Sequence, residues 1–136
     1  MKTVFADSHY WIAAVNPGDP WAKAAKVARS ALGEVFIVTT DEVLTEFLAA
    51  LSKGEHMRKQ AAKMVRAILE NPNVKVIPQT RDSFLKGLTL YENRSDKEYS
   101  LTDCIAMNVM KAESLVEVLT NDKHFEQEEF TVLIKK

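Results

Sequence analysis

Short runs of β-branched and aromatic residues alternate along this chain with longer segments whose apolar residues recur every three to four positions. The first pattern predicts buried strands, and the second predicts helices with one apolar face. We expect strands at residues 3–6, 35–38, 74–77, 117–119 and 130–134. We expect helices at residues 8–15, 20–32, 40–51, 55–70, 81–92 and 100–111, with a short helical turn at 123–126. Such alternation predicts a three-layer α/β/α fold, with a central parallel five-stranded sheet covered by helices on both faces.

Size and composition indicate a single domain over residues 1–136, because a chain of this length with 46% hydrophobic residues suits one compact core. No apolar run approaches the roughly 20 residues that cross a bilayer, and the segment MKTVFADS lacks the apolar stretch of a signal peptide. We therefore expect a cytoplasmic protein without a membrane partner. The single cysteine, Cys104, lies in an apolar helical run, where a buried structural thiol is the ordinary interpretation.

The formal net charge is −1, so no global positive field indicates binding to nucleic acid. Basic residues gather only around the start of the helix expected at 55–70: Lys53, His56, Arg58, Lys59, Lys63 and Arg66. A solvated helix face is the favoured interpretation of this patch. Phosphate binding is the alternative, with Lys53 and Arg58 as candidate contacts to a substrate.

Four acidic residues occupy positions that the expected fold would bring together. Asp7 directly follows the first strand and Asp122 follows the fourth, and the carboxyl ends of parallel strands meet at one edge of a sheet. Asp103 lies in the first turn of a helix that is apolar almost all round, and Glu46 lies on a neighbouring helix. Gathered carboxylates repel one another unless a cation lies among them. The pattern thus favours a divalent metal site and a metal-dependent phosphodiesterase.

The helix expected at 40–51 carries two acids that could reach this edge. Glu46 falls on the border of the apolar stripe, where it can face a crevice, whereas Glu42 falls further toward solvent. Thr39 and Glu42 also have the spacing of a capping box, which explains Glu42 without a site. Glu46 is therefore the preferred candidate.

Each of the other acids also has an explanation as a helix cap. Asp7 could cap the first helix, and either Asn121 or Asp122 could cap the short turn that follows. Ser100 and Asp103 have capping-box spacing. Independent caps have no reason to fall at one sheet edge, whereas a metal site requires that placement, so the metal interpretation is favoured.

The three histidines, His9, His56 and His124, lack the local spacing of a metal site. His9 lies two residues after Asp7 and could touch a phosphate, although a surface histidine is the more ordinary interpretation.

Around these residues the chain resembles the PIN-domain family of small metal-dependent ribonucleases, which includes the VapC-type toxins of bacteria and archaea. The resemblance covers essentially the whole chain and is carried by the segments VFADSHYWIAA, TTDEVLTEFLAAL, YSLTDCIAM and TNDKHF. It implies a parallel sheet of strand order 3-2-1-4-5.

The resemblance also implies a role for each matched residue. The family's four acidic positions correspond to Asp7, Glu46, Asp103 and Asp122. Asp7, Asp103 and Asp122 are expected to bind Mg²⁺ or Mn²⁺, and Glu46 either binds metal or positions the attacking water. Thr120 resembles a hydroxyl residue that the family keeps beside the acids, and we expect it to contact substrate. Asp96 lies outside the matched positions and is interpreted as peripheral.

The implied activity is that of a Mg²⁺- or Mn²⁺-dependent endoribonuclease that hydrolyses RNA phosphodiester bonds, as the toxin of a toxin–antitoxin pair. The implied partners are an RNA substrate, a small antitoxin that covers the acidic groove, and a second copy in a homodimer. One alternative is a non-catalytic α/β module that binds protein or nucleic acid. A receiver-type signalling domain is another, but it would require adjacent acids after the first strand, and FADSH offers one.

Overall fold

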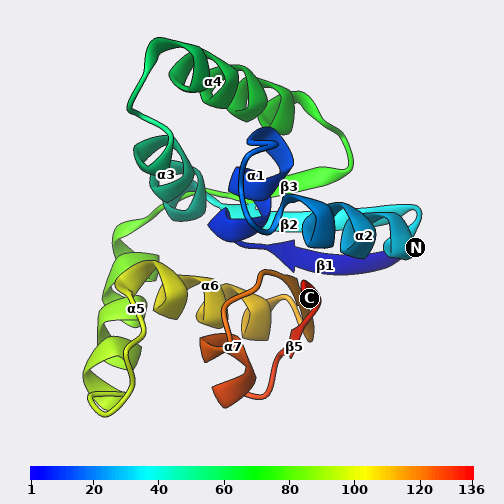
Figure 1. Cartoon of the computed structure of the whole chain (residues 1–136). Coiled ribbons are helices and arrows are strands. Elements are labelled where there is room, and N and C mark those ends of the chain that lie inside the picture. The colour runs from blue at the N-terminus through cyan, green and yellow to red at the C-terminus, as the bar shows by residue number, and fades with distance from the viewer.

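The sheet of the computed structural model, which describes residues 1–136, has the predicted topology. Its strands are β1 (Lys2–Ala6), β2 (Val35–Thr40), β3 (Val74–Ile77), β4 (Glu117–Leu119) and β5 (Thr131–Val132). All neighbouring pairs are parallel, in the order β3-β2-β1-β4-β5 (Figure 1). The expected strand order is confirmed.

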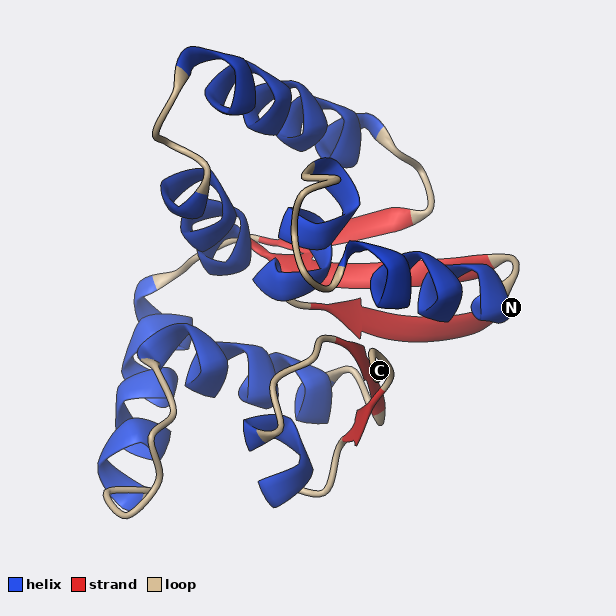
Figure 2. Ribbon diagram, in the orientation of Figure 1, coloured by secondary structure: helices blue, strands red, loops and turns tan.

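Helices cover this sheet in two groups, and Figure 2 shows them in blue around the red strands. The chain crosses from β1 to β2 to β3 in one direction and from β3 to β4 to β5 in the other. Right-handed crossovers in opposite directions place their helices on opposite faces, so the fold has three layers. The first group is α1 (Ser8–Val15), α2 (Ala22–Leu32), α3 (Asp41–Ala50) and α4 (Glu55–Glu70). The second group is α5 (Arg81–Asn93), α6 (Leu101–Ala112) and α7 (His124–Gln127).

The central strand β1 lies in the middle of the core. Val4, Phe5 and Ala6 are completely buried, and Phe5 pairs with the equally buried Val118 of β4. A strand covered on both faces has a continuous apolar sequence, as VFA does here.

Cys104 is also completely buried, and burial raises the pKa of its thiol to about 11. The structural interpretation of this cysteine is confirmed.

No helix combines the length and the apolar character that crossing a membrane requires.

The end of β2 differs from the prediction. The strand continues through Thr39 and Thr40, which pair with Val76 and Ile77 of β3, so α3 begins one residue later than expected. Thr40 caps this helix by accepting a hydrogen bond from the backbone N–H of Val43 (3.1 Å). Thr39 instead donates its hydroxyl to the carbonyl of Ala6 (2.9 Å). The expected capping box of Thr39 and Glu42 is therefore wrong, because its first residue belongs to the sheet.

The last strand is shorter than the expected 130–134, but its hydrogen bonds to the neighbouring segment continue to residue 134. Beyond β5, the backbone N–H of Leu133 donates to Val118 (3.0 Å) and that of Ile134 donates to Thr120 (3.2 Å). The second of these bonds fixes the backbone that leads from β4 toward Asp122.

The segment between α5 and α6 is anchored by an ion pair. The Arg94 guanidinium donates to both carboxylate oxygens of Glu128 (3.0 and 3.2 Å), and the Tyr99 hydroxyl donates to the same carboxylate (2.9 Å). The hydrogen bond from Arg94 lowers the pKa of Glu128. These contacts hold the residues that lead directly into Ser100 and the start of α6, where Asp103 lies.

Candidate metal centre

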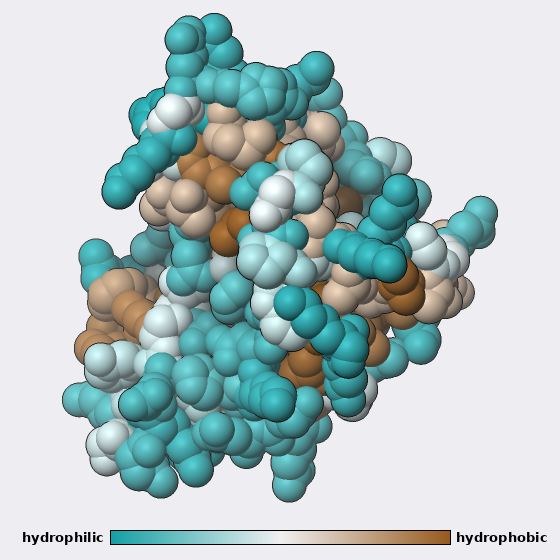
Figure 3. All heavy atoms as spheres, viewed as in Figure 1, coloured by the Kyte–Doolittle hydropathy of each residue, from teal (hydrophilic) through white to brown (hydrophobic).

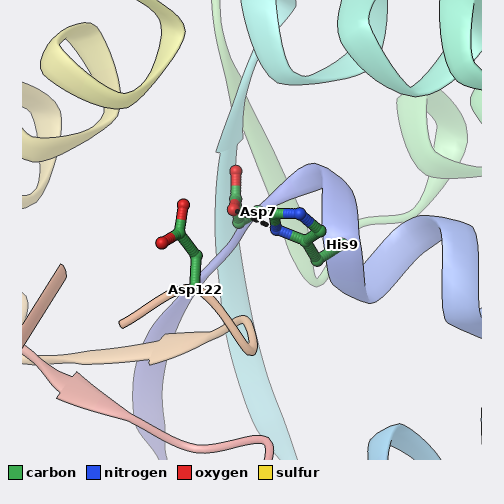
Figure 4. Close-up of side chains that lie close together, drawn as sticks. All are labelled: Asp7, His9 and Asp122. Carbon is green, nitrogen blue, oxygen red and sulfur yellow. Dashed lines mark hydrogen bonds and ion pairs between the residues drawn. The ribbon is translucent and has the colours of Figure 1, made fainter. Parts of the chain in front are cut away.

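Asp7 and Asp122 lie at the same edge of the sheet, as predicted. Asp7 follows β1 and is 1% exposed, and its backbone N–H donates to the carbonyl of Leu119 at the end of β4 (3.1 Å). Asp122 follows β4 by three residues. Figure 4 shows the two carboxylates side by side, with the ring of His9 next to Asp7.

Asp7 occupies the N-cap position of α1, yet its side chain makes no capping hydrogen bond. Its Oδ2 instead accepts from the hydroxyl of Thr120 (2.9 Å) and lies 3.2 Å from Nδ1 of His9. Its Oδ1 is buried and has no hydrogen-bond partner. A buried carboxylate oxygen without a partner is unfavourable until a cation or a donor reaches it. The interpretation of Asp7 as a cap is therefore wrong.

Asp103 forms the cap that its spacing predicts, and its carboxylate also lies near the other acids. Its N–H donates to the Ser100 hydroxyl, and its Oδ2 accepts from the Ser100 N–H, each at 3.0 Å, so the capping box is present. Burial raises the pKa of its carboxyl to about 6, and the charges of Asp7, Asp122 and Glu46 add to the effect. The cap thus holds this carboxylate within the field of the other three acids.

Asp122 caps the short turn of α7, since its Oδ1 accepts from the backbone N–H of His124 (2.9 Å). Its Oδ2 takes part in no hydrogen bond, which leaves this oxygen available to a ligand. Glu46 is half-buried on α3, and one of its oxygens accepts a hydrogen bond from the Ser8 hydroxyl. The residue that follows Asp7 therefore orients Glu46 toward the site.

Glu42 does not join this cluster. Its Oε2 is buried without a hydrogen-bond partner, and burial raises the pKa of its carboxyl. The expectation that Glu42 lies further toward solvent than Glu46 is not met, since both are half-buried, but only Glu46 is among the acids whose charges raise the pKa of Asp103.

Two of the three histidines lie among the acids. His9 approaches Asp7, and the pKa of His9 is raised, chiefly by its hydrogen bond to Asp7. Nδ1 of His124 lies 3.3 Å from Asp122 Oδ1 and 3.9 Å from Asp103 Oδ2. The spacing of the histidines along the chain does not indicate this arrangement, because each group also includes an acid from another segment.

The donor atoms form two groups that could hold a metal ion. In one, ligand atoms of Asp7, His9 and Asp122 lie within 4.8 Å of one another, and in the other those of Asp103, Asp122 and His124 do. Asp122 belongs to both groups. The unpartnered Oδ1 of Asp7 supports the fit of a cation, because a divalent ion would satisfy it and offset the repulsion among the carboxylates.

Thr120 is completely buried beside the acids, so its expected contact with substrate stays a prediction. Its Oγ1 donates to Asp7 and accepts from the backbone N–H of Asp122 (3.1 Å), so it positions both acids.

The remaining candidates lie apart from the acids. Lys53 and Arg58 are exposed around the start of α4, and Arg58 donates to the carbonyl of Ser52 (3.2 Å). Neither makes an ion pair or a hydrogen bond with the four acids, so no structural contact supports their expected role. Asp96 is exposed beside Lys97, as expected for a peripheral residue.

Substituting Thr120 with valine should weaken divalent metal binding by about 10- to 100-fold, because the hydroxyl that orients Asp7 and Asp122 is lost while the side-chain volume is kept. Isothermal titration with Mn²⁺ measures the change. Thr120→Ser keeps the hydroxyl and is the matched control. Equal affinity of the valine variant and the unmodified chain would contradict this role.

Comparisons with known proteins agree with this fold. VapC20 of Mycobacterium tuberculosis, a sarcin–ricin loop cleaving toxin, is similar in structure with a TM-score of 0.84 and 23% identity, covering 94% of this chain and 96% of that chain. VapBC2 from Rickettsia felis, bound to a promoter DNA fragment, gives a TM-score of 0.61 at 15% identity, with 96% of each chain covered. FitAcB from Neisseria gonorrhoeae gives 0.63 at 14% identity, also with 96% of each chain covered.

No curated protein matches the sequence. The family model of the PIN domain matches residues 4–130, nearly the whole chain. The chain therefore belongs to the PIN domain family.

Proposed function

We propose that this chain is a Mg²⁺- or Mn²⁺-dependent endoribonuclease and the toxin of a toxin–antitoxin pair, acting in the cytoplasm. The observation that carries the proposal is the buried carboxylate of Asp7, with one unpartnered oxygen, inside a cluster of acids drawn from four separate elements. A stable fold has no need of such a cluster, whereas phosphodiester hydrolysis by divalent metal depends on one. Membership of the PIN domain family supports the same activity.

The proposed role of each acid follows from its position. Asp7, Asp103 and Asp122 would hold the metal. The support for this is that Asp122 shares one group of possible ligand atoms with Asp7 and the other with Asp103. A bound divalent ion would polarise the scissile phosphate and lower the pKa of a water molecule. Glu46, oriented by the Ser8 hydroxyl, would accept a hydrogen bond from the attacking water and direct it toward phosphorus.

Cleavage of RNA by the purified chain tests this function. An oligonucleotide with the sarcin–ricin loop sequence is the first substrate to examine, because the similar VapC20 cleaves that loop, and a single-stranded RNA is the second. We expect cleavage in millimolar Mn²⁺ or Mg²⁺ and none in EDTA, read as new RNA ends by sequencing. A chain that binds no divalent ion and cleaves neither RNA would instead be a non-catalytic binding module.

The proposed antitoxin has a candidate binding groove between α1 and α2. A pocket of about 720 Å³ there is lined by apolar residues that include Ala13 and Pro17 and by the basic residues Lys23, Lys26 and Arg29. Neither lysine is in an ion pair, and α2 contains no acidic residue. An acidic amphipathic segment of an antitoxin would complement this groove, in addition to the segment expected to cover the acids.

A second copy of the chain is the other proposed partner. The support for a homodimer comes from α5, where Leu85, Leu88 and Tyr91 expose 38–51% of their surface. Apolar side chains that gather on one helix are typical of a protein interface.

A further inference from the structure

The same tripeptide pattern follows two neighbouring strands. Asp7-Ser8-His9 comes directly after β1, and Asp122-Lys123-His124 comes after β4. The two strands are paired in parallel, with Ala6 opposite Leu119. The pairing therefore brings two aspartate–histidine pairs to one edge of the sheet.

The distances within the two pairs are nearly equal. Nδ1 of His9 lies 3.2 Å from Oδ2 of Asp7, and Nδ1 of His124 lies 3.3 Å from Oδ1 of Asp122. Adjacent ligands of an octahedral ion, bound at about 2.1 Å, are separated by about 3 Å. Both pairs thus have the spacing of neighbouring ligands on one ion.

A histidine beside a metal-binding carboxylate need not bind the metal itself. It can instead orient the carboxylate through a hydrogen bond. Nδ1 of His9 has such partners, Oδ2 of Asp7 at 3.2 Å and the Thr120 hydroxyl at 3.3 Å, and a metal ion bound by His9 and Asp7 would take the place of the proton between them. Nδ1 of His124 has no such partner, because it is buried and makes no hydrogen bond. Together with Oδ1 of Asp7, this nitrogen gives the site two buried atoms that lack a partner, on residues whose groups both include Asp122.

We propose that His9 and His124 are nitrogen ligands of two metal positions that share Asp122, and that the site therefore binds Mn²⁺ in preference to Mg²⁺. The inference rests on the proposed metal-dependent function. Each position would combine one imidazole with two carboxylates: His9 with Asp7 and Asp122, and His124 with Asp103 and Asp122. Mg²⁺ takes oxygen ligands almost exclusively, whereas first-row transition metals accept imidazole more readily.

Pulsed electron paramagnetic resonance of the Mn²⁺-loaded chain tests this proposal without any activity measurement. We expect hyperfine coupling to ¹⁴N, which changes to ¹⁵N coupling when histidine alone is isotopically labelled. The labelled protein is unsubstituted, so this readout does not depend on the folding of a variant.

Substitution measures the contribution to selectivity. In the His9→Ala/His124→Ala variant we expect the ratio of Mn²⁺ to Mg²⁺ affinity, from calorimetric titration, to fall by about 10-fold or more. His56→Ala is the matched control, because His56 is exposed on α4 and is the only other histidine.

Two contrary results are distinguishable. Mn²⁺ that binds without nitrogen coupling, with an unchanged affinity ratio in the double variant, would overturn the proposal and leave the metal-dependent nuclease intact. A chain that binds neither ion would remove the proposed function as well.

Discussion

Replacing Asp7 with asparagine should reduce RNA cleavage by about 100-fold or more, because the substitution removes a direct metal ligand. Asparagine has nearly the same shape and can still accept the hydrogen bond from Thr120, but it lacks the negative charge that a divalent ion requires. The rate of appearance of new RNA ends in Mn²⁺ measures the loss. The melting temperature without metal should not fall, since the substitution removes a buried charge.

Asp96→Asn is the matched control, because it makes the same chemical change at an exposed residue outside the cluster. Its activity should equal that of the unmodified chain. Asp103→Asn should behave like Asp7→Asn, and the double variant should show no cleavage above background. Undiminished cleavage by the purified double variant would refute the assignment of the site.

The layers follow closely from the sequence, because they depend on patterns that are local, whereas the strand order was implied only by the resemblance to the PIN-domain family. The continuous apolar run of β1 and the periodic helices between strands are sufficient to indicate a covered parallel sheet. Residues at element ends are less predictable, since tertiary contacts decide them. Thr39 has the spacing of a helix cap, yet pairing with Val76 draws it into β2.

The acids of the site could be predicted because strand ends and helix faces fix their direction. The approach of the histidines to the acid cluster could not be predicted from local spacing. Each histidine follows an acid of its own segment, and the two segments meet only because β1 pairs with β4. The repeated Asp-x-His pattern was a signal in the sequence that could have indicated them. Thr120 was matched correctly to a position beside the acids, but only the structure shows that its hydroxyl donates to Asp7.

Divalent metal should stabilise the chain strongly at about pH 7.5 and much less at about pH 5. Burial first, and then the neighbouring acids, raise the pKa of Asp103 from 3.8 to about 6. Between these values the folded chain binds more protons than the unfolded chain, so stability falls as the pH rises through this window. Above about pH 6, the ionised Asp103 lowers the free energy of unfolding by about 3 kcal/mol, unless a cation takes the place of the proton.

Melting temperatures with EDTA and with saturating Mn²⁺ measure this effect. The metal-induced increase should be larger at the higher pH by roughly 5–10 °C, because Mn²⁺ offsets a charge that protonation has already removed at the lower pH. Asp103→Asn is the informative variant: asparagine can retain the capping bond from Ser100 but cannot titrate. Without metal, this variant should be more stable than the unmodified chain above pH 6 and should lose most of the response to Mn²⁺. An equal response at both pH values, or a full response in the variant, would show that Asp103 does not bear the charge that the ion neutralises.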